Sequence, residues 1–179
     1  MILNERDSRH EHILSVARQM MTAARTAPKG KGVDIIETAT ICGQEELKTL
    51  SDMMITISGE TGMKFFLRDA DNILNSECVV IIGTHSQTQG LNCAHCGYSL
   101  CADKPADVPC AINTIDVGIA IGSACATAAD LRVDTRVMFS AGLAAQRLNW
   151  LDGCRQVFAI AVSASSKSPY FDRKPKESK

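Results

Sequence analysis

Two kinds of hydrophobic pattern alternate along this chain of 179 residues. Segments in which apolar residues recur every three or four positions predict helices, and short apolar runs rich in β-branched residues predict buried strands. Ser8 is expected to cap the first helix. The helices are predicted over residues 8–26, 44–58, 63–74, 113–131 and 136–149, and the strands over residues 33–41, 78–83 and 157–163. This alternation predicts an α+β (α/β-like) fold, with a central mixed sheet flanked by helices.

Composition and charge are those of a folded globular protein. Hydrophobic residues make up 45% of the chain and charged residues 22%, with a net charge of −1. So small a net charge provides no general attraction to nucleic acid or to an acidic membrane surface, and we expect neither as a partner. Residues 1–12 are polar, and the apolar stretch Val117–Leu131 contains Ser123, Thr127 and Asp130, which we interpret as too short and too polar to span a bilayer. We therefore expect a cytoplasmic protein.

A segment without periodicity, at about residues 84–112, interrupts the single domain predicted for residues 1–179. A loop this long is unusual in a compact domain unless something organises it. In a reducing compartment, clustered cysteines are more often metal ligands or redox groups than disulfides. The spacing here is Cys-x2-Cys-x4-Cys-x8-Cys, formed by Cys93, Cys96, Cys101 and Cys110. We interpret this segment as a metal-binding insertion.

The spacing leaves the identity of the metal open. Four thiolates select an iron–sulfur cluster or zinc, and the spacing matches neither common ferredoxin pattern. Structural zinc sites usually have two separated cysteine pairs, and only the first pair here has that form. We therefore favour a 4Fe–4S cluster, with zinc as the alternative metal. His95 is expected at the surface of a tight turn, and the other cysteines are expected to be small buried hydrophobic residues: Cys42, Cys78, Cys125 and Cys154.

The stretch from CVVIIG at residue 78 to LNW at residue 150, which includes LNCAHCGYSLCADKPADVPC, resembles a known family. That family consists of uncharacterised prokaryotic proteins described as containing a ferredoxin domain. The resemblance extends over nearly the whole chain and includes all four cysteine positions. It implies a cluster but names no reaction.

Three segments resemble the flavin-dependent nitroreductases: AARTAPKGKGVDIIETATI (23–41), DVGIAIGSACATAADLRV (116–133) and VFAIAVSASSKSPYFDRK (157–174). The resemblance implies a nitroreductase-like fold, FMN as a cofactor, and a homodimer with cofactor sites at its interface. The chain departs from the family's pattern at Lys29–Gly32, where the family usually has polar side chains, including an Asn, that touch the flavin. The aromatic residue after that loop is missing, and the usual arginine-rich start is reduced to Arg6-Asp7-Ser8-Arg9.

Positive charge and glycine coincide in the predicted turn between the first helix and the first strand. Glycine lets the backbone approach a ligand and lysine supplies charge for a phosphate, although the same residues also suit a basic surface turn. If FMN binds, we expect its phosphate to contact Lys29 and Lys31, with one or more of Arg6, Arg9 and Arg173, and we expect Gly32 to belong to the same cofactor site.

Three functions remain open from the sequence. The first is an FMN-dependent oxidoreductase, in which the cluster exchanges electrons with a flavin or a small substrate. The second is a flavin-free, ferredoxin-like carrier that serves a redox partner protein, and the third is a zinc-stabilised binding module. The four histidines are not at catalytic-zinc spacing. The pattern identifies no substrate, electron donor or pathway.

Overall fold

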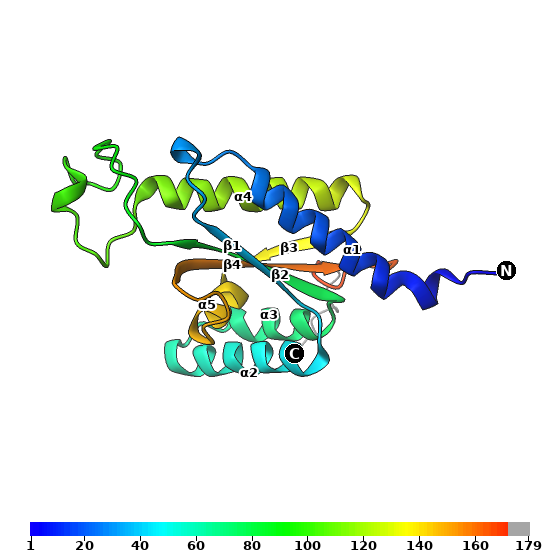
Figure 1. Cartoon of the computed structure of the whole chain (residues 1–179). Coiled ribbons are helices and arrows are strands. Elements are labelled where there is room, and N and C mark those ends of the chain that lie inside the picture. The colour runs from blue at the N-terminus through cyan, green and yellow to red at the C-terminus, as the bar shows by residue number, and fades with distance from the viewer. Residues whose placement is uncertain (172–179) are drawn as a thin grey trace.

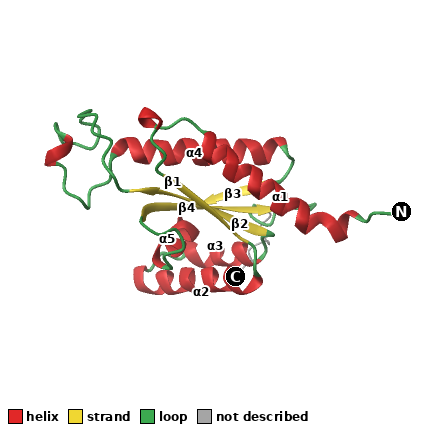
Figure 2. Cartoon of the chain, in the orientation of Figure 1, coloured by secondary structure: helices red, strands yellow, loops and turns green. Residues whose placement is uncertain are grey.

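A four-stranded sheet lies between two layers of helices in the computed structural model, which describes residues 1–171 (Figure 1). The strand order is β1-β2-β4-β3. Helices α1 and α4 cover one face of the sheet, and α2, α3 and α5 cover the other (Figure 2). The predicted fold class is confirmed, and the three strand pairings of the described sheet are all antiparallel, where a mixed sheet was expected.

Most predicted elements are present with small changes in their limits. The helices are α1 (Glu5–Thr26), α2 (Gln44–Thr61), α3 (Phe65–Leu74), α4 (Ala111–Asp130) and α5 (Phe139–Arg147). The strands are β1 (Ile36–Ile41), β2 (Cys78–His85), β3 (Asp134–Met138) and β4 (Cys154–Ser163). Two short 3-10 turns, η1 (Gly30–Gly32) and η2 (Cys101–Asp103), lie in the loops.

The central strand β2 divides the core into two parts. Its side chains alternate between the faces, as the two-residue period of a strand requires. Val79 and Ile81 pack with α2, α3 and α5, whereas Cys78, Val80 and Ile82 pack with α1 and α4. Both faces of β2 are therefore buried, which explains its nearly continuous apolar sequence.

Three local predictions are wrong. The cap of α1 is Asn4, whose side chain accepts a hydrogen bond from the backbone N–H of Arg6 at 3.1 Å, and Ser8 lies inside the helix. The helix predicted from residue 136 begins at Phe139, because the residues before it pair with β4 as the edge strand β3. Cys42, expected to be buried, is exposed at the end of β1.

Helix α4 (Ala111–Asp130) is longer than the apolar stretch Val117–Leu131, which we interpreted above as too short to span a bilayer. By length and composition it could cross a membrane, and it is the one helix within residues 1–171 with that property. Ala120, Ala124 and Ala128 are nevertheless fully buried in the core that α4 shares with α1. Ser123 donates a hydrogen bond to the carbonyl of Ala23 on α1 at 3.0 Å. We therefore interpret the small apolar side chains of α4 as residues that let two helices pack closely.

Candidate metal and cofactor site

The cysteine segment is a loop, residues 86–110, that projects beyond one end of the sheet between β2 and α4 (Figure 1). Its backbone turns sharply near the first two cysteines. Asn92 (φ 47°), Ala94 (φ 59°) and Gly97 (φ 89°) adopt left-handed conformations, which cost energy for residues other than glycine. Such turns leave backbone N–H groups free to point at sulfur atoms.

Cys101 is fixed by a reciprocal pair of hydrogen bonds. The backbone N–H of Asn92 donates to Cys101 Sγ at 3.2 Å, and the backbone N–H of Cys101 donates to Asn92 Oδ1 at 2.8 Å. The bonds hold Cys101 beside the residue that precedes Cys93. N–H groups directed at sulfur also tune the potential of an iron–sulfur cluster.

Cys110 lies at the N-terminus of α4 and is buried, with 6% of its surface exposed. Burial raises the pKa of its thiol, but the backbone N–H groups of Gln89, Asn113 and Ile112 and the charge of Lys104 outweigh it, so that the pKa is lower than usual. These donors stabilise a thiolate, the form of cysteine that binds metals.

The donor set fits a soft metal, but the sulfurs are not gathered around one point. All four loop cysteines are free thiols, three of them half-buried. Within residues 1–171, no three His, Cys, Asp or Glu side chains form a group that could hold a metal ion. Four thiolates on one loop suit an iron–sulfur cluster or zinc. Shared binding therefore requires the loop to bring its sulfurs closer together.

The start of the loop is anchored to α4 by Asn113, of which 1% is exposed. Its Nδ2 donates to the carbonyls of His85 at 3.1 Å and Gln87 at 2.6 Å. Its Oδ1 accepts a hydrogen bond from Gln89 Nε2 at 3.0 Å. One buried amide thus uses three hydrogen bonds to fix the first residues of the loop.

The Lys29–Gly32 turn is anchored to the same helix. Both carboxylate oxygens of Asp116, which is 2% exposed, accept the backbone N–H of Gly30 at 3.0 Å. A Cβ on Gly30 would lie 2.6 Å from the Ile112 side chain, so glycine is needed there. Lys31 Nζ donates to the carbonyl of Gln89 at 3.1 Å. The two loops that the sequence singled out separately therefore lie side by side.

Asn113, Asp116 and Gln89 also belong to this site, although the sequence pattern did not predict them. The available signal was the pair of polar residues three positions apart at the start of an otherwise apolar helix, since this spacing places both on one face. The buried state of all three side chains is visible only in the structure.

Lys29 has a structural role in the described chain. Its ammonium group donates to the carbonyls of Ala24, at 2.6 Å, and Arg25, which end α1 without partners inside the helix. Burial lowers the pKa of Lys29, but the group remains positioned to stabilise the C-terminus of the helix. Of the two lysines, Lys31 is the better placed for a ligand.

The arginines expected to join these lysines lie elsewhere or outside the described residues. Arg6 and Arg9 are in the first turns of α1, where Arg9 pairs with Glu5 at 2.6 Å. At about 1.5 Å of rise per residue, the length of α1 separates Arg9 from the Lys29–Gly32 turn by roughly 25 Å. One chain therefore does not bring these arginines to the same phosphate as Lys31. Arg173 lies outside the described residues 1–171.

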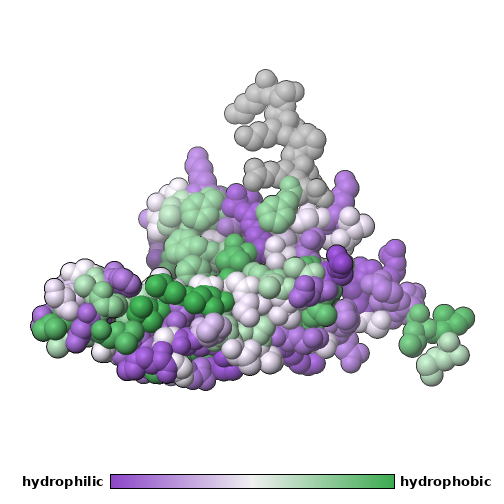
Figure 3. All heavy atoms as spheres, turned by 90° about the horizontal axis from the view of Figure 1, so that it is seen from above, coloured by the Kyte–Doolittle hydropathy of each residue, from purple (hydrophilic) through white to green (hydrophobic). Residues whose placement is uncertain are grey.

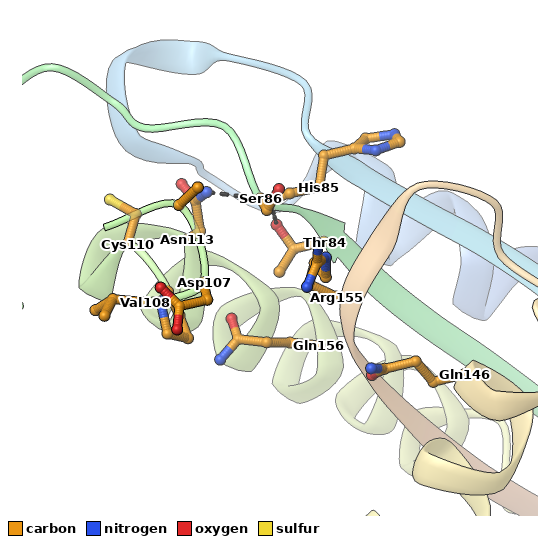
Figure 4. Close-up of a pocket in the computed structure, with 12 residues that line it drawn as sticks. Thr84, His85, Ser86, Asp107, Val108, Cys110, Asn113, Gln146, Arg155 and Gln156 are labelled. Atoms are coloured by element: carbon orange, nitrogen blue, oxygen red, sulfur yellow. Dashed lines mark hydrogen bonds between the residues drawn. The ribbon is translucent and has the colours of Figure 1, made fainter. Parts of the chain in front are cut away.

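A polar cavity of about 140 Å³ adjoins Cys110 (Figure 4). Its wall combines Thr84 from β2, Asn113 from α4, and Arg155 and Gln156 from β4. The imidazole of His85 points away from this space in Figure 4 and contacts Glu37 at 3.2 Å. Clefts for cofactors and drug-sized ligands usually measure about 300 to 1,000 Å³. The cavity of one chain therefore suits a small polar group and is too small for a flavin.

Sequence comparison relates the chain to proteins without an assigned activity. Residues 106–173 match a family described as "uncharacterized protein containing a ferredoxin domain". Of the four loop cysteines, that match includes Cys110 alone. An uncharacterized protein from Archaeoglobus fulgidus is 41% identical over 187 residues, which cover 99% of this chain and 100% of the relative.

Structural comparison relates the fold to flavoproteins. A BluB-like flavoprotein from Clostridium difficile 630 is similar with a TM-score of 0.57 and 17% identity, over 86% of this chain and 84% of that one. A nitroreductase with bound FMN from Desulfitobacterium hafniense DCB-2 has a TM-score of 0.59 and 13% identity, over 86% of this chain and 78% of that one. Another nitroreductase with bound FMN, from Bacteroides fragilis NCTC 9343, has a TM-score of 0.58 and 12% identity, over 85% of this chain and 77% of that one. These similarities confirm the predicted nitroreductase-like fold.

Proposed function

Because the chain belongs to the family of uncharacterized proteins that contain a ferredoxin domain, we propose that it is a redox protein whose four loop cysteines bind a 4Fe–4S cluster. The family and the nitroreductase-like fold support a redox protein in general. The observation that carries the finer proposal is the loop 86–110 itself. It holds four free thiols, and backbone N–H groups point at two of them, Cys101 and Cys110.

We further propose that the cluster exchanges electrons with a flavin or a small substrate bound beside the loop. A cluster supplies single electrons, and a flavin can accept them one at a time. The support is the contact between the loop and the Lys29–Gly32 turn through Lys31 and Gln89. The Lys31 ammonium has three N–H donors and uses one on Gln89, so the others are available to an anionic group such as a phosphate.

We also propose that the protein works as a homodimer joined through the outer face of α4. Ile115 (49% exposed) and Ile119 (40%) lie on this face, with no atoms within 4 Å of the Cβ positions of Gly118 and Gly122. Figure 3, a view from above, shows hydrophobic residues gathered on part of the molecular face that contains the α1–α4 layer. A second chain would cover these residues and enlarge a cofactor site that one chain leaves too small.

The cluster is tested on protein purified without oxygen. A broad brown absorption shoulder with iron and sulfide in the assay supports the proposal, whereas colourless protein with stoichiometric zinc would establish the zinc-stabilised module instead. Cys96→Ala should lose most of the metal and make the loop sensitive to protease, because metal binding and local folding are coupled. The matched control, Cys125→Ala in the middle of α4, should keep its metal.

The flavin is tested by titrating FMN into the protein and following the quenching of its fluorescence. Lys31→Ala should weaken binding by about tenfold to a hundredfold, since a charge-assisted hydrogen bond contributes about 1.5 to 3 kcal/mol. Lys48→Ala removes an exposed lysine on α2, paired with Asp52, and serves as the control. Absence of FMN binding up to millimolar concentration, in protein that holds its cluster, would favour the flavin-free carrier.

The dimer is tested by light scattering at micromolar concentration. Ile115→Lys should convert the dimer to a monomer, because it places a charge in the proposed interface. Ile55→Lys on α2 is a matched control, since both isoleucines are 49% exposed. A wild-type protein that is monomeric under these conditions would count heavily against a cofactor site formed between two chains.

A further inference from the structure

Two cysteines outside the metal loop face each other across the first two strands. The pairing of β1 with β2 ends at Ile41 opposite Val79. One more residue along this register places Cys42 opposite Cys78. Residues directly opposite in an antiparallel pair have Cα atoms about 4.5 to 5.5 Å apart, within the range of about 4.4 to 6.8 Å that a disulfide spans.

Both side chains lie on the face of the sheet that α1 covers. Cys78 is a member of the core that packs against α1. Two residues before Cys42, the hydroxyl of Thr40 contacts the sulfur of Met21 on α1 at 3.4 Å, and the two-residue period of a strand puts Cys42 on the same side. Cys42 also lines a surface groove with Leu14 and Met21. The two sulfur atoms therefore leave the sheet in the same direction.

The two thiols differ in accessibility and interact electrostatically. Cys42 is exposed, whereas Cys78 is 0% exposed. Burial, followed by the negative charges of Cys42 and Glu77, raises the pKa of Cys78 to about 12. A reagent in solution therefore reaches Cys42 first, and Cys78 is a buried, protonated thiol.

We propose that Cys42 and Cys78 form a reversible thiol–disulfide site that reacts with small organic disulfides. The Cys42 thiolate attacks one sulfur of the reagent, breaks its S–S bond and releases one thiolate. Cys78 then gives up its proton, and its sulfur attacks that of Cys42 and expels the second thiolate. Two protein thiols are oxidised and one organic disulfide is reduced to two thiols. The intermediate leaves Cys42 uncharged, which removes one of the causes of the high pKa of Cys78.

This site is separate from the metal loop. Cys78 begins β2, and the loop leaves the other end of that strand after His85. At about 3.3 Å per residue, the strand separates the two sites by roughly 23 Å. Cys154 lies opposite His85 on β4, at that distant end, and is therefore a suitable control cysteine. The thiol–disulfide site does not depend on metal binding, so the two proposals fail independently.

The test exposes the full-length native protein to oxidised glutathione. Free thiols are then blocked with N-ethylmaleimide under unfolding conditions, and the cysteines are mapped by peptide mass spectrometry. We expect Cys42 linked to Cys78, with loss of their two alkylatable thiols and complete reversal by dithiothreitol. Cys42→Ser should abolish the link to Cys78, and Cys154→Ser should retain it.

Three results would overturn the proposal. They are an unmodified Cys42, a stable glutathione adduct on Cys42 with Cys78 still alkylatable, and a link from Cys42 to any other cysteine. The same peptide map records the four loop cysteines separately, so that oxidation in the loop is not mistaken for reaction at this site. Cys42 is exposed at the end of a strand, so its replacement by serine should leave the fold intact.

Discussion

The anchoring of the cysteine loop by Asn113 predicts the effect of Asn113→Ala. The substitution removes three hydrogen bonds, to His85, Gln87 and Gln89. Each is worth about 1 kcal/mol, and buried groups left without a partner cost more. Alanine offsets a few tenths of a kcal/mol of this loss, because its helix propensity is higher than that of asparagine. We expect a net loss of about 3 kcal/mol, concentrated where the loop meets α4.

That magnitude is measured by limited proteolysis of the loop 86–110. A loss of about 3 kcal/mol in the free energy of local opening corresponds to a rise in cleavage rate on the order of a hundredfold. Metal content should fall with it, because the loop must be ordered to gather its sulfurs. The matched control is Thr127→Ala on the same helix, whose hydroxyl donates, among residues 1–171, to the carbonyl of Ser123 alone. Unchanged cleavage in folded Asn113→Ala protein would refute the anchoring role.

Three further predictions concern the stability of the fold. The carboxylate of Asp69 has 6% side-chain exposure and lies beside Arg68 and Arg136. Asp69→Asn should therefore lower the free energy of unfolding, measured in urea, by about 3 kcal/mol. The control Asp71→Asn, on the exposed face of the same helix, should lower it by less than about 0.5 kcal/mol. Gly142→Ala would place a Cβ 2.2 Å from the carbonyl of Val157 and should cost about 2 kcal/mol or more, visible as a lower Tm. Burial raises the pKa of Tyr170 from 10.0 to about 12. The stability that its protonated phenol contributes is therefore fully present below pH 10 and is lost as the pH rises to about 12. Tyr170→Phe should make the free energy of unfolding less dependent on pH in this range.

Patterns within the sequence were sufficient for most of the elements and for the metal hypothesis. The helices and the buried strand β2 follow from the spacing of apolar residues, because each element must bury one face or both. The loop 86–110 was recognisable because it lacks periodicity and concentrates cysteines. The resemblance to nitroreductases predicted the fold, which the structural comparison confirmed.

Features that depend on two distant segments were not accessible in this way. Residues 136–138 have no strong strand pattern, and they form β3 only because β4 provides an edge with which to pair. Cys42 is exposed because β1 ends beside it, although its residue type suggested burial. In both cases tertiary contacts override the local preference.

The site shows the same division between local and distant information. The sequence by itself identified the candidate residues for the chemistry: four thiols in one loop and a lysine between glycines in another. Only the tertiary structure decided that Asp116 holds Gly30, 86 positions away, that Lys31 meets Gln89, and that Lys29 caps a helix. The physical reason is that a hydrogen bond depends on distance and direction in space, which periodicity along the chain does not encode.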